Sequence, residues 1–178
     1  MKYLSVNEPN NFSFHDAVIN KVRVEDNDMI WTVEAANAEK TNSQNPYDKA
    51  MCIDSAEVVF INFHIDSIVA PEYKTVHNGS EYVTPEKILT GSEIKDLIDL
   101  ILREEELGYI YSLNGVKSDD GFTIEIMLCP YREISPFNGM FYDIKIACDE
   151  FTVGWDDFSG AAWYESDVWK SQFKDTEE

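Results

Sequence analysis

The sequence predicts an α+β fold, made mainly of antiparallel β-sheet with one amphipathic helix packed on it. Short runs of branched and aromatic residues recur along the chain, and turn-forming residues separate them. Only residues 92–108 carry a helical period. Because short turns join antiparallel strands, the sheet is expected to be a meander. The pattern leaves open whether that sheet forms an open sandwich or a barrel.

The first half of the chain is predicted to begin with a β-hairpin. Its strands are residues 17–24 and 29–35, and the acidic residues between them are typical of a tight turn. Residues 36–50 have no period and are interpreted as a long loop. Residues 51–66 are predicted to form the longest strand, and residues 70–91 a crossover into the helix.

The helix is expected at about 92–107, because five aliphatic residues recur there at intervals of three and four. They are Ile94, Leu97, Ile98, Ile101 and Leu102. Ser92 has the side chain of an N-cap, and Gly108 is expected to end the helix in a left-handed conformation. One face of this helix should therefore be buried against the sheet.

The second half is predicted to contain four or five further strands. Turns are expected at 114–115, 119–121, 138–139, 149–150 and 156–160. A frayed tail is expected at about 171–178. The chain has 178 residues, of which 44% are apolar, so we expect a single domain spanning 1–178.

The charge is the main compositional feature. There are 34 acidic and 14 basic residues, which give a formal net charge of -20. Residues 92–178 carry 20 acids and 7 bases, a balance of -13, against -7 for residues 1–91. Such a surface disfavours binding to nucleic acid or to an anionic membrane and favours a basic protein partner. The alternative is that the acids simply keep the protein soluble.

The three cysteines, Cys52, Cys129 and Cys148, show no metal-binding spacing. Reduced thiols suit a cytoplasmic protein. The first residues lack a signal-like apolar core, and no stretch approaches the roughly 20 apolar residues of a membrane span. We therefore expect a soluble cytoplasmic protein without a cofactor. The sequence does not predict its oligomeric state.

Two histidines lie close to aspartates, in His15-Asp16 and in the pair His64 and Asp66. Imidazole with carboxylate can bind zinc or act as an oriented base. Such residues also bond to turn backbone, which is the more common role. The sequence contains no P-loop, Rossmann, serine-hydrolase or zinc-protease motif.

Residues 149–169 contain six acids and no lysine or arginine. We expect a hairpin there that places Trp155 near Trp163, with core packing as the favoured role of both rings. The functional alternative is an acidic patch around an exposed aromatic that docks a basic partner. Its residues would be Trp155, Asp156, Asp157, Glu165 and Asp167, joined by Glu104, Glu105 and Glu106. A sugar stacked on tryptophan is a further possibility.

Asn11 to Asp16 (NFSFHD) open the meander, an amphipathic helix lies mid-chain, and the C-terminal segment is acidic and rich in tryptophan. This layout resembles the small, acidic, mostly β bacterial proteins of unassigned function, some of which are immunity proteins of polymorphic toxin systems. The resemblance implies a cytosolic protein that binds a partner, often a basic toxin, without catalysis. We therefore expect a non-enzymatic protein-binding module. The alternatives are a metal-dependent or hydrolytic enzyme using the His-Asp pairs, and a carbohydrate-binding accessory module.

Overall fold

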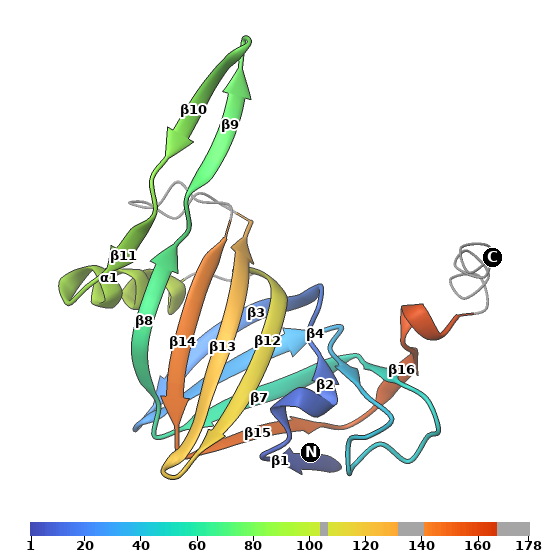
Figure 1. Cartoon of the computed structure of the whole chain (residues 1–178). Helices are drawn as coiled ribbons and strands as arrows, with labels where there is room; N and C mark the ends of the chain where they lie inside the picture. The colour runs from blue at the N-terminus through green and yellow to red at the C-terminus, as the bar shows by residue number, and fades with distance from the viewer. Residues whose placement is uncertain (104–106, 132–140, 167–178) are drawn as a thin grey trace.

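The main element of the fold is one antiparallel sheet of ten strands that bends over on itself (Figure 1). The computed structural model describes residues 1–103, 107–131 and 141–166. In spatial order the strands are β1 (Tyr3–Val6), β15 (Glu150–Trp155), β7 (Ser55–Ile61), β4 (Asp28–Glu34), β3 (Ala17–Glu25), β12 (Gly108–Ser118), β13 (Gly121–Pro130), β14 (Tyr142–Cys148), β8 (His64–Ala70) and β11 (Lys87–Leu89). The sheet is open, with β1 and β11 at its edges. The predicted α+β class is confirmed.

The remaining elements lie around this sheet. A small four-stranded sheet has the order β16 (Phe158–Ala161), β6 (Met51–Ile53), β5 (Asn37–Ala38) and β2 (Phe12–Ser13). A separate hairpin consists of β9 (Tyr73–His77) and β10 (Ser80–Thr84), and the one α-helix among the described residues is α1 (Ser92–Ile101). Two short 3-10 helices, η1 (Pro9–Asn11) and η2 (Trp163–Glu165), complete the described part of the chain.

The core lies between the two layers that the bent sheet makes. On β13 the side chains alternate as expected: Phe122, Ile124, Ile126 and Leu128 are buried. They face the inner side of the other layer, where Val58 and Phe60 of β7 are fully buried. Every second side chain of these strands is buried, and this burial determines the register of strand pairing. A slip of one residue would turn every apolar side chain outward.

The predicted first hairpin is confirmed, because β3 and β4 pair from Val18 opposite Glu34 to Glu25 opposite Asp28. The prediction of one long strand at 51–66 is wrong. The segment divides into β6, β7 and β8, and the break before β8 lies at Asn62, whose φ is +49°. Asparagine tolerates this left-handed conformation, which lets the chain pass from one layer to the other.

Helix α1 packs its apolar stripe on the open end of the two layers. Leu97 and Ile101 are buried, and Ile98 lines a small apolar cavity of about 20 Å³ between helix and sheet. The helix is shorter than predicted. It ends at Ile101, and Gly108 is not its C-cap but the first residue of β12, where an added Cβ would lie 2.3 Å from the Cys129 carbonyl oxygen. The N-cap is Gly91, so Ser92 is the first residue of the helix and not the cap that the sequence predicted.

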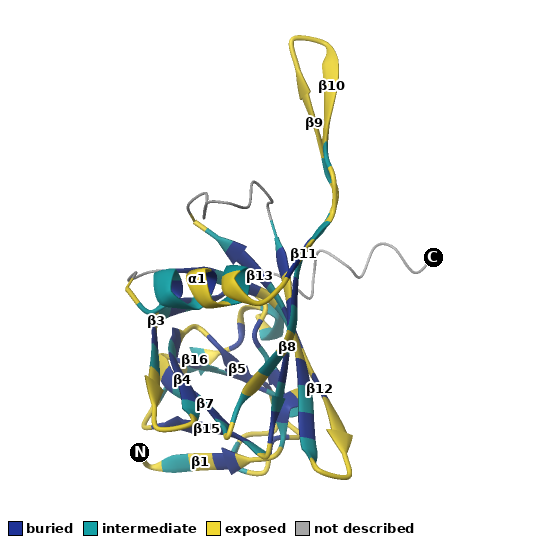
Figure 2. Ribbon diagram, turned by 90° about the vertical axis from the view of Figure 1, so that its left-hand side faces the viewer, coloured by how far each residue is buried: buried dark blue, intermediate teal, exposed yellow. Residues whose placement is uncertain are grey.

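The segment 70–91 is not the simple crossover that we predicted. The Asn78-Gly79 pair closes the β9–β10 hairpin, which projects from the body and is exposed along its length (Figures 1 and 2). A turn predicted at Asn114-Gly115 is also wrong, because both residues pair with β13 inside β12. Gly115 is needed there for another reason: its amide and carbonyl bond with the Asn10 side chain, and a Cβ would clash with Pro9.

The predicted loop at 36–50 carries the short strand β5 and is otherwise irregular. Side-chain hydrogen bonds hold it against the N-terminal segment, because the Asn42 amide donates to Ser5 and the Ser43 amide donates to Glu8. Burial alone would raise the pKa of Glu8, but hydrogen bonds from Ser43 and Ser5 bring it below its usual value. The loop is therefore fixed against the body of the protein.

Candidate functional site

The structure places Trp155 in the core, as the favoured prediction had it, and not at the surface as the anchor of a docking patch. Its side chain is 1% exposed and packs against the rings of Tyr3, Phe12 and Phe158. The predicted hairpin that would bring it beside Trp163 does not form. β15 pairs with β1 and β7, whereas β16 pairs with β6. Trp155 therefore has no surface to offer a partner.

The acids of residues 149–166 do not gather in one patch. Asp149 accepts a hydrogen bond from Asn62 at one end of β15, and Asp156 and Asp157 lie beyond its other end. Glu165 follows in η2, where it accepts a hydrogen bond from the Ala50 amide at 3.3 Å. Asp167 and Glu104, Glu105 and Glu106 lie outside the described residues. The window is therefore divided among separate surfaces.

A smaller group of carboxylates does converge, and we call it the acidic hollow. Asp54 and Glu57 join Asp156 and Asp157 around a depression of about 280 Å³. The N-terminal amine of Met1 lies 3.3 Å from Asp156, and Arg23 pairs with Glu57 at 2.6 Å.

Sequence reasoning missed half of this group. Asp54 and Glu57 precede Asp156 and Asp157 by about a hundred residues, and only the pairing of β7 with β15 brings them together. The amine of Met1 and the guanidinium of Arg23 already lie against carboxylates of the acidic hollow.

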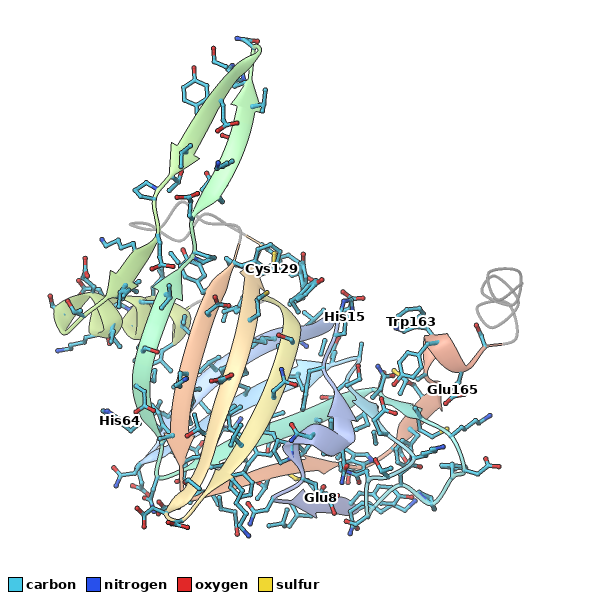
Figure 3. The ribbon with its side chains drawn as sticks, viewed as in Figure 1. Glu8, His15, His64, Cys129, Trp163 and Glu165 are labelled. Atoms are coloured by element: carbon cyan, nitrogen blue, oxygen red, sulfur yellow. The ribbon has the colours of Figure 1, made fainter. Side chains whose placement is uncertain are left out.

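The two His-Asp pairs exist as local contacts but are not brought together. His15 Nδ1 lies 2.9 Å from Asp16 Oδ2, and His64 Nε2 lies 3.9 Å from Asp66 Oδ1. His15 and His64 lie on opposite sides of the molecule (Figure 3). Among residues 1–103, 107–131 and 141–166, no three His, Cys, Asp or Glu side chains are grouped so that they could hold a metal ion. The two pairs therefore do not form the single metal-binding or hydrolytic site that was the alternative prediction.

His15 and Asp16 belong instead to a second depression, which we call the Trp163 hollow. It has a volume of about 290 Å³ and is lined by His15, Asp16, Ala35, Asn37, Cys52, Ser159, Gly160, Ala161 and Trp163. Trp163 is 48% exposed at its edge, on the same side of the molecule as His15 (Figure 3). The ring of Tyr111 lies 5.1 Å from that of His15.

The base of the Trp163 hollow is formed by three residues that pair across neighbouring strands of the small sheet. Asn37 pairs with Cys52, and Cys52 pairs with Gly160, so the three residues face the same side. Asn37 is only 2% exposed, and its Oδ1 has no hydrogen-bond partner. Nothing lies within 4 Å of where a Cβ on Gly160 would be. No pattern in the sequence indicates this role for Asn37, which lies in a polar, aperiodic segment.

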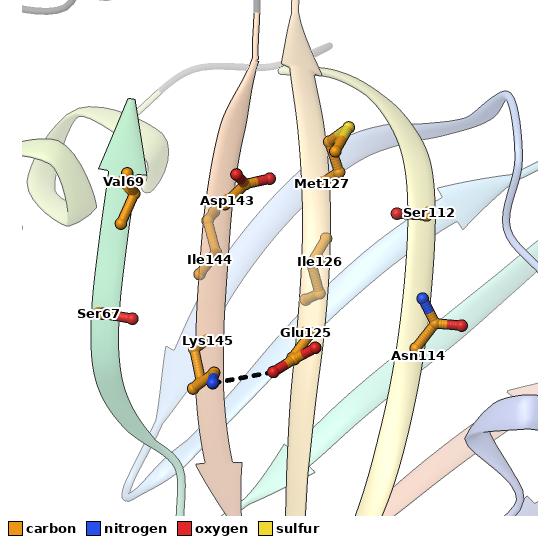
Figure 4. Close-up of a pocket in the computed structure, with 10 residues that line it drawn as sticks. All are labelled: Ser67, Val69, Ser112, Asn114, Glu125, Ile126, Met127, Asp143, Ile144 and Lys145. Atoms are coloured by element: carbon orange, nitrogen blue, oxygen red, sulfur yellow. Dashed lines mark ion pairs between the residues drawn. The ribbon is translucent and has the colours of Figure 1, made fainter. Parts of the chain in front are cut away.

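A third depression, of about 410 Å³, lies on the outer face of β8, β14, β13 and β12 (Figure 4). Lys145 and Glu125 form a 2.8 Å ion pair across two of its strands. Partial burial, and then the nearby carboxylate of Glu86, raise the pKa of Asp143. The lining of this outer face therefore includes one ion pair, between Lys145 and Glu125.

The three cysteines are free, and they differ in exposure. Cys148 is buried, and burial followed by the charge of Asp149 raises its pKa to about 11. Cys52 is partly exposed in the Trp163 hollow. We expect iodoacetamide at pH 8 to label Cys52 well before Cys148, because the thiolate is the reactive form. Peptide mass spectrometry over time would measure this, with labelling in denaturant as the control. Equal rates in the folded protein would contradict it.

No helix in the described ranges is long and apolar enough to cross a membrane. Comparison with protein-family models, with curated proteins and with solved structures finds no match to this chain.

Proposed function

We propose that this protein is a non-enzymatic binding module for a basic protein partner. The observation that carries the proposal is the acidic hollow, where Asp54, Glu57, Asp156 and Asp157 converge on a molecule of net charge -20. Carboxylates of like charge repel one another, so their convergence favours the binding of cations. The amine of Met1 beside Asp156 illustrates the kind of group that fits there.

The class of partner follows from charge and from the family resemblance. A field of this sign speeds encounter with a positively charged protein and repels nucleic acid. The resemblance to immunity proteins makes a basic toxin the first partner to test, and a neighbouring gene is the first place to seek it. The three free cysteines suit the cytoplasm, where we place this function.

Neutralising the acidic hollow is expected to weaken binding to a decalysine peptide about tenfold. The variant is Asp54→Asn, Asp156→Asn and Asp157→Asn together, and Glu57 is retained because it pairs with Arg23. Tenfold corresponds to about 1.4 kcal/mol, which three exposed charge interactions of roughly 0.2–1 kcal/mol each supply. Isothermal titration calorimetry at about 20 mM and about 500 mM salt would measure the affinity and its screening.

The matched control removes three charges elsewhere on the exposed surface, at Asp96, Asp119 and Asp120. If the control loses as much affinity as the variant, net charge alone accounts for binding and the acidic hollow is not the site. If the wild-type protein binds no basic peptide at low salt, the proposed function is wrong.

A carbohydrate-binding module is the second candidate, and one observation favours it. Sugars stack on exposed aromatic rings beside polar acceptors. Trp163 is exposed at a hollow that contains Asp16 and Asn37, which meets this requirement. A glycan array would test it, with Trp163→Ala as the variant that should abolish any signal.

A further inference from the structure

The Trp163 hollow contains a buried hydrogen-bond acceptor without a donor. Asn37 lies in β5 at 2% exposure, and its Oδ1 has no hydrogen-bond partner. A buried amide oxygen in this state costs roughly 1–3 kcal/mol, since it has lost water and gained nothing in return. This oxygen is enclosed, so a ligand that donates a hydrogen bond to it recovers that cost only when the Asn37 side chain turns toward the hollow.

The same hollow contains a carboxylate in a defined position. Asp16 holds its Oδ2 2.9 Å from Nδ1 of His15, and the ring of Tyr111 lies 5.1 Å from the imidazole. The aspartate side chain remains 61% exposed. A cationic donor can therefore reach Asp16 without displacing a lysine or an arginine.

The aromatic wall of the hollow is anchored by its neighbours. Tyr164, next to Trp163, donates a 2.6 Å hydrogen bond to Glu39, and Glu165 accepts one from the Ala50 amide. Burial, followed by the bond to Glu39, raises the pKa of Tyr164, so this phenol keeps its proton at every physiological pH. Both bonds hold η2, the short helix that carries Trp163, so the indole ring is kept in place for stacking.

The floor of the hollow leaves room for a side chain. Gly160 shares a rung with Cys52 and Asn37, and a Cβ there would meet nothing within 4 Å. The volume of about 290 Å³ accommodates one long side chain.

We propose that the Trp163 hollow receives an arginine side chain of the basic partner. The guanidinium stacks on Trp163, pairs with Asp16 and donates to Asn37. This inference rests on the proposed function, because the arginine belongs to the basic protein. A guanidinium carries its donors in a plane and can stack flat on an aromatic face, whereas the ammonium of lysine is a compact point charge that is found over aromatic rings less often. A neutral sugar could donate hydroxyl hydrogen bonds to Asp16 but would bring no positive charge to pair with it.

The test compares decaarginine with decalysine, two peptides of equal charge, by calorimetry on the full chain. The proposed function predicts salt-dependent binding of both. The arginine pocket predicts in addition that decaarginine binds about tenfold more tightly. Three variants are expected to remove that preference: Asp16→Asn, Trp163→Ala and Gly160→Leu, the last of which fills the hollow without changing charge.

Asp26→Asn is the matched control for Asp16→Asn. Both aspartates flank β3 with positive φ, at +67° for Asp16 and +54° for Asp26, and both substitutions remove one charge. Asparagine tolerates these conformations, so neither variant should misfold. Only Asp16→Asn is expected to reduce the preference for arginine.

The outcomes separate the two proposals. Equal binding of both peptides, or the same loss in Asp26→Asn, overturns the arginine pocket and leaves the proposed function standing. Absence of binding to either peptide overturns both. Binding of a glycan that Gly160→Leu and Trp163→Ala abolish overturns the arginine pocket in favour of the carbohydrate module.

Discussion

Replacing Trp155 with alanine is expected to lower the free energy of unfolding by about 3–5 kcal/mol. The side chain is 1% exposed and lies within 5.4–5.8 Å of the rings of Tyr3, Phe12 and Phe158, measured between centroids. Truncation would leave a cavity where β1, β15 and the small sheet meet. Urea denaturation followed by circular dichroism would measure the loss, because it does not depend on the fluorescence of the missing indole.

Two companion variants separate packing from other effects. The Trp155 Nε1 group is buried without a hydrogen-bond partner, so Trp155→Phe removes an unsatisfied donor and should cost only about 1 kcal/mol. Trp163→Ala removes an indole that is 48% exposed and should cost less than about 1 kcal/mol. If Trp155→Ala were no more costly than Trp163→Ala, the assignment of Trp155 to the core would be wrong.

The sequence predicted the elements whose pattern is local. Alternation on β13 and on β7 follows from one buried face, and the turn between β3 and β4 is formed by its own residues. The stripe of α1 was likewise predicted by its spacing, although the helix ends at Ile101. Each of these features depends on residues within about ten positions of one another.

The features that depend on distant pairing could not be predicted. The C-terminal hairpin was expected because two aromatic strands follow one another, yet β15 lies between β1 and β7. Asn114-Gly115 has the composition of a turn, but Asn10 bonds to Gly115 from the other end of the chain and keeps it within a strand. In both cases tertiary contacts override the local preference.

In the candidate sites, too, only the residues that are close in sequence could be predicted to lie together. Asp156 and Asp157 were named from an acidic window, but their partners Asp54 and Glu57 come from the start of β7 and the residue before it. His15 and Asp16 were named as a pair, while the amide of Asn37 that shares their hollow had no distinguishing signal. Residue types suggest chemistry in a sequence, but only strand pairing decides which of them meet.

Replacing Gly121 with alanine is expected to destabilise the protein by roughly 2–4 kcal/mol. Gly121 begins β13 with a φ of +134°, a conformation that residues with a side chain rarely adopt. A Cβ there would lie 2.2 Å from the carbonyl oxygen of Cys148, and backbone cannot move aside as a flexible side chain can. The substitution therefore strains both Gly121 and the pairing of β13 with β14, which supports the core.

Gly160→Ala is the matched control, because it places the same methyl group in a strand with open space around it. It should leave stability unchanged or raise it by up to about 1 kcal/mol, since alanine loses less conformational entropy on folding than glycine. Urea denaturation of both variants would measure the difference. Equal stability of the two would mean that Gly121 is not constrained by the Cys148 carbonyl, and the register of β13 against β14 would then need revision.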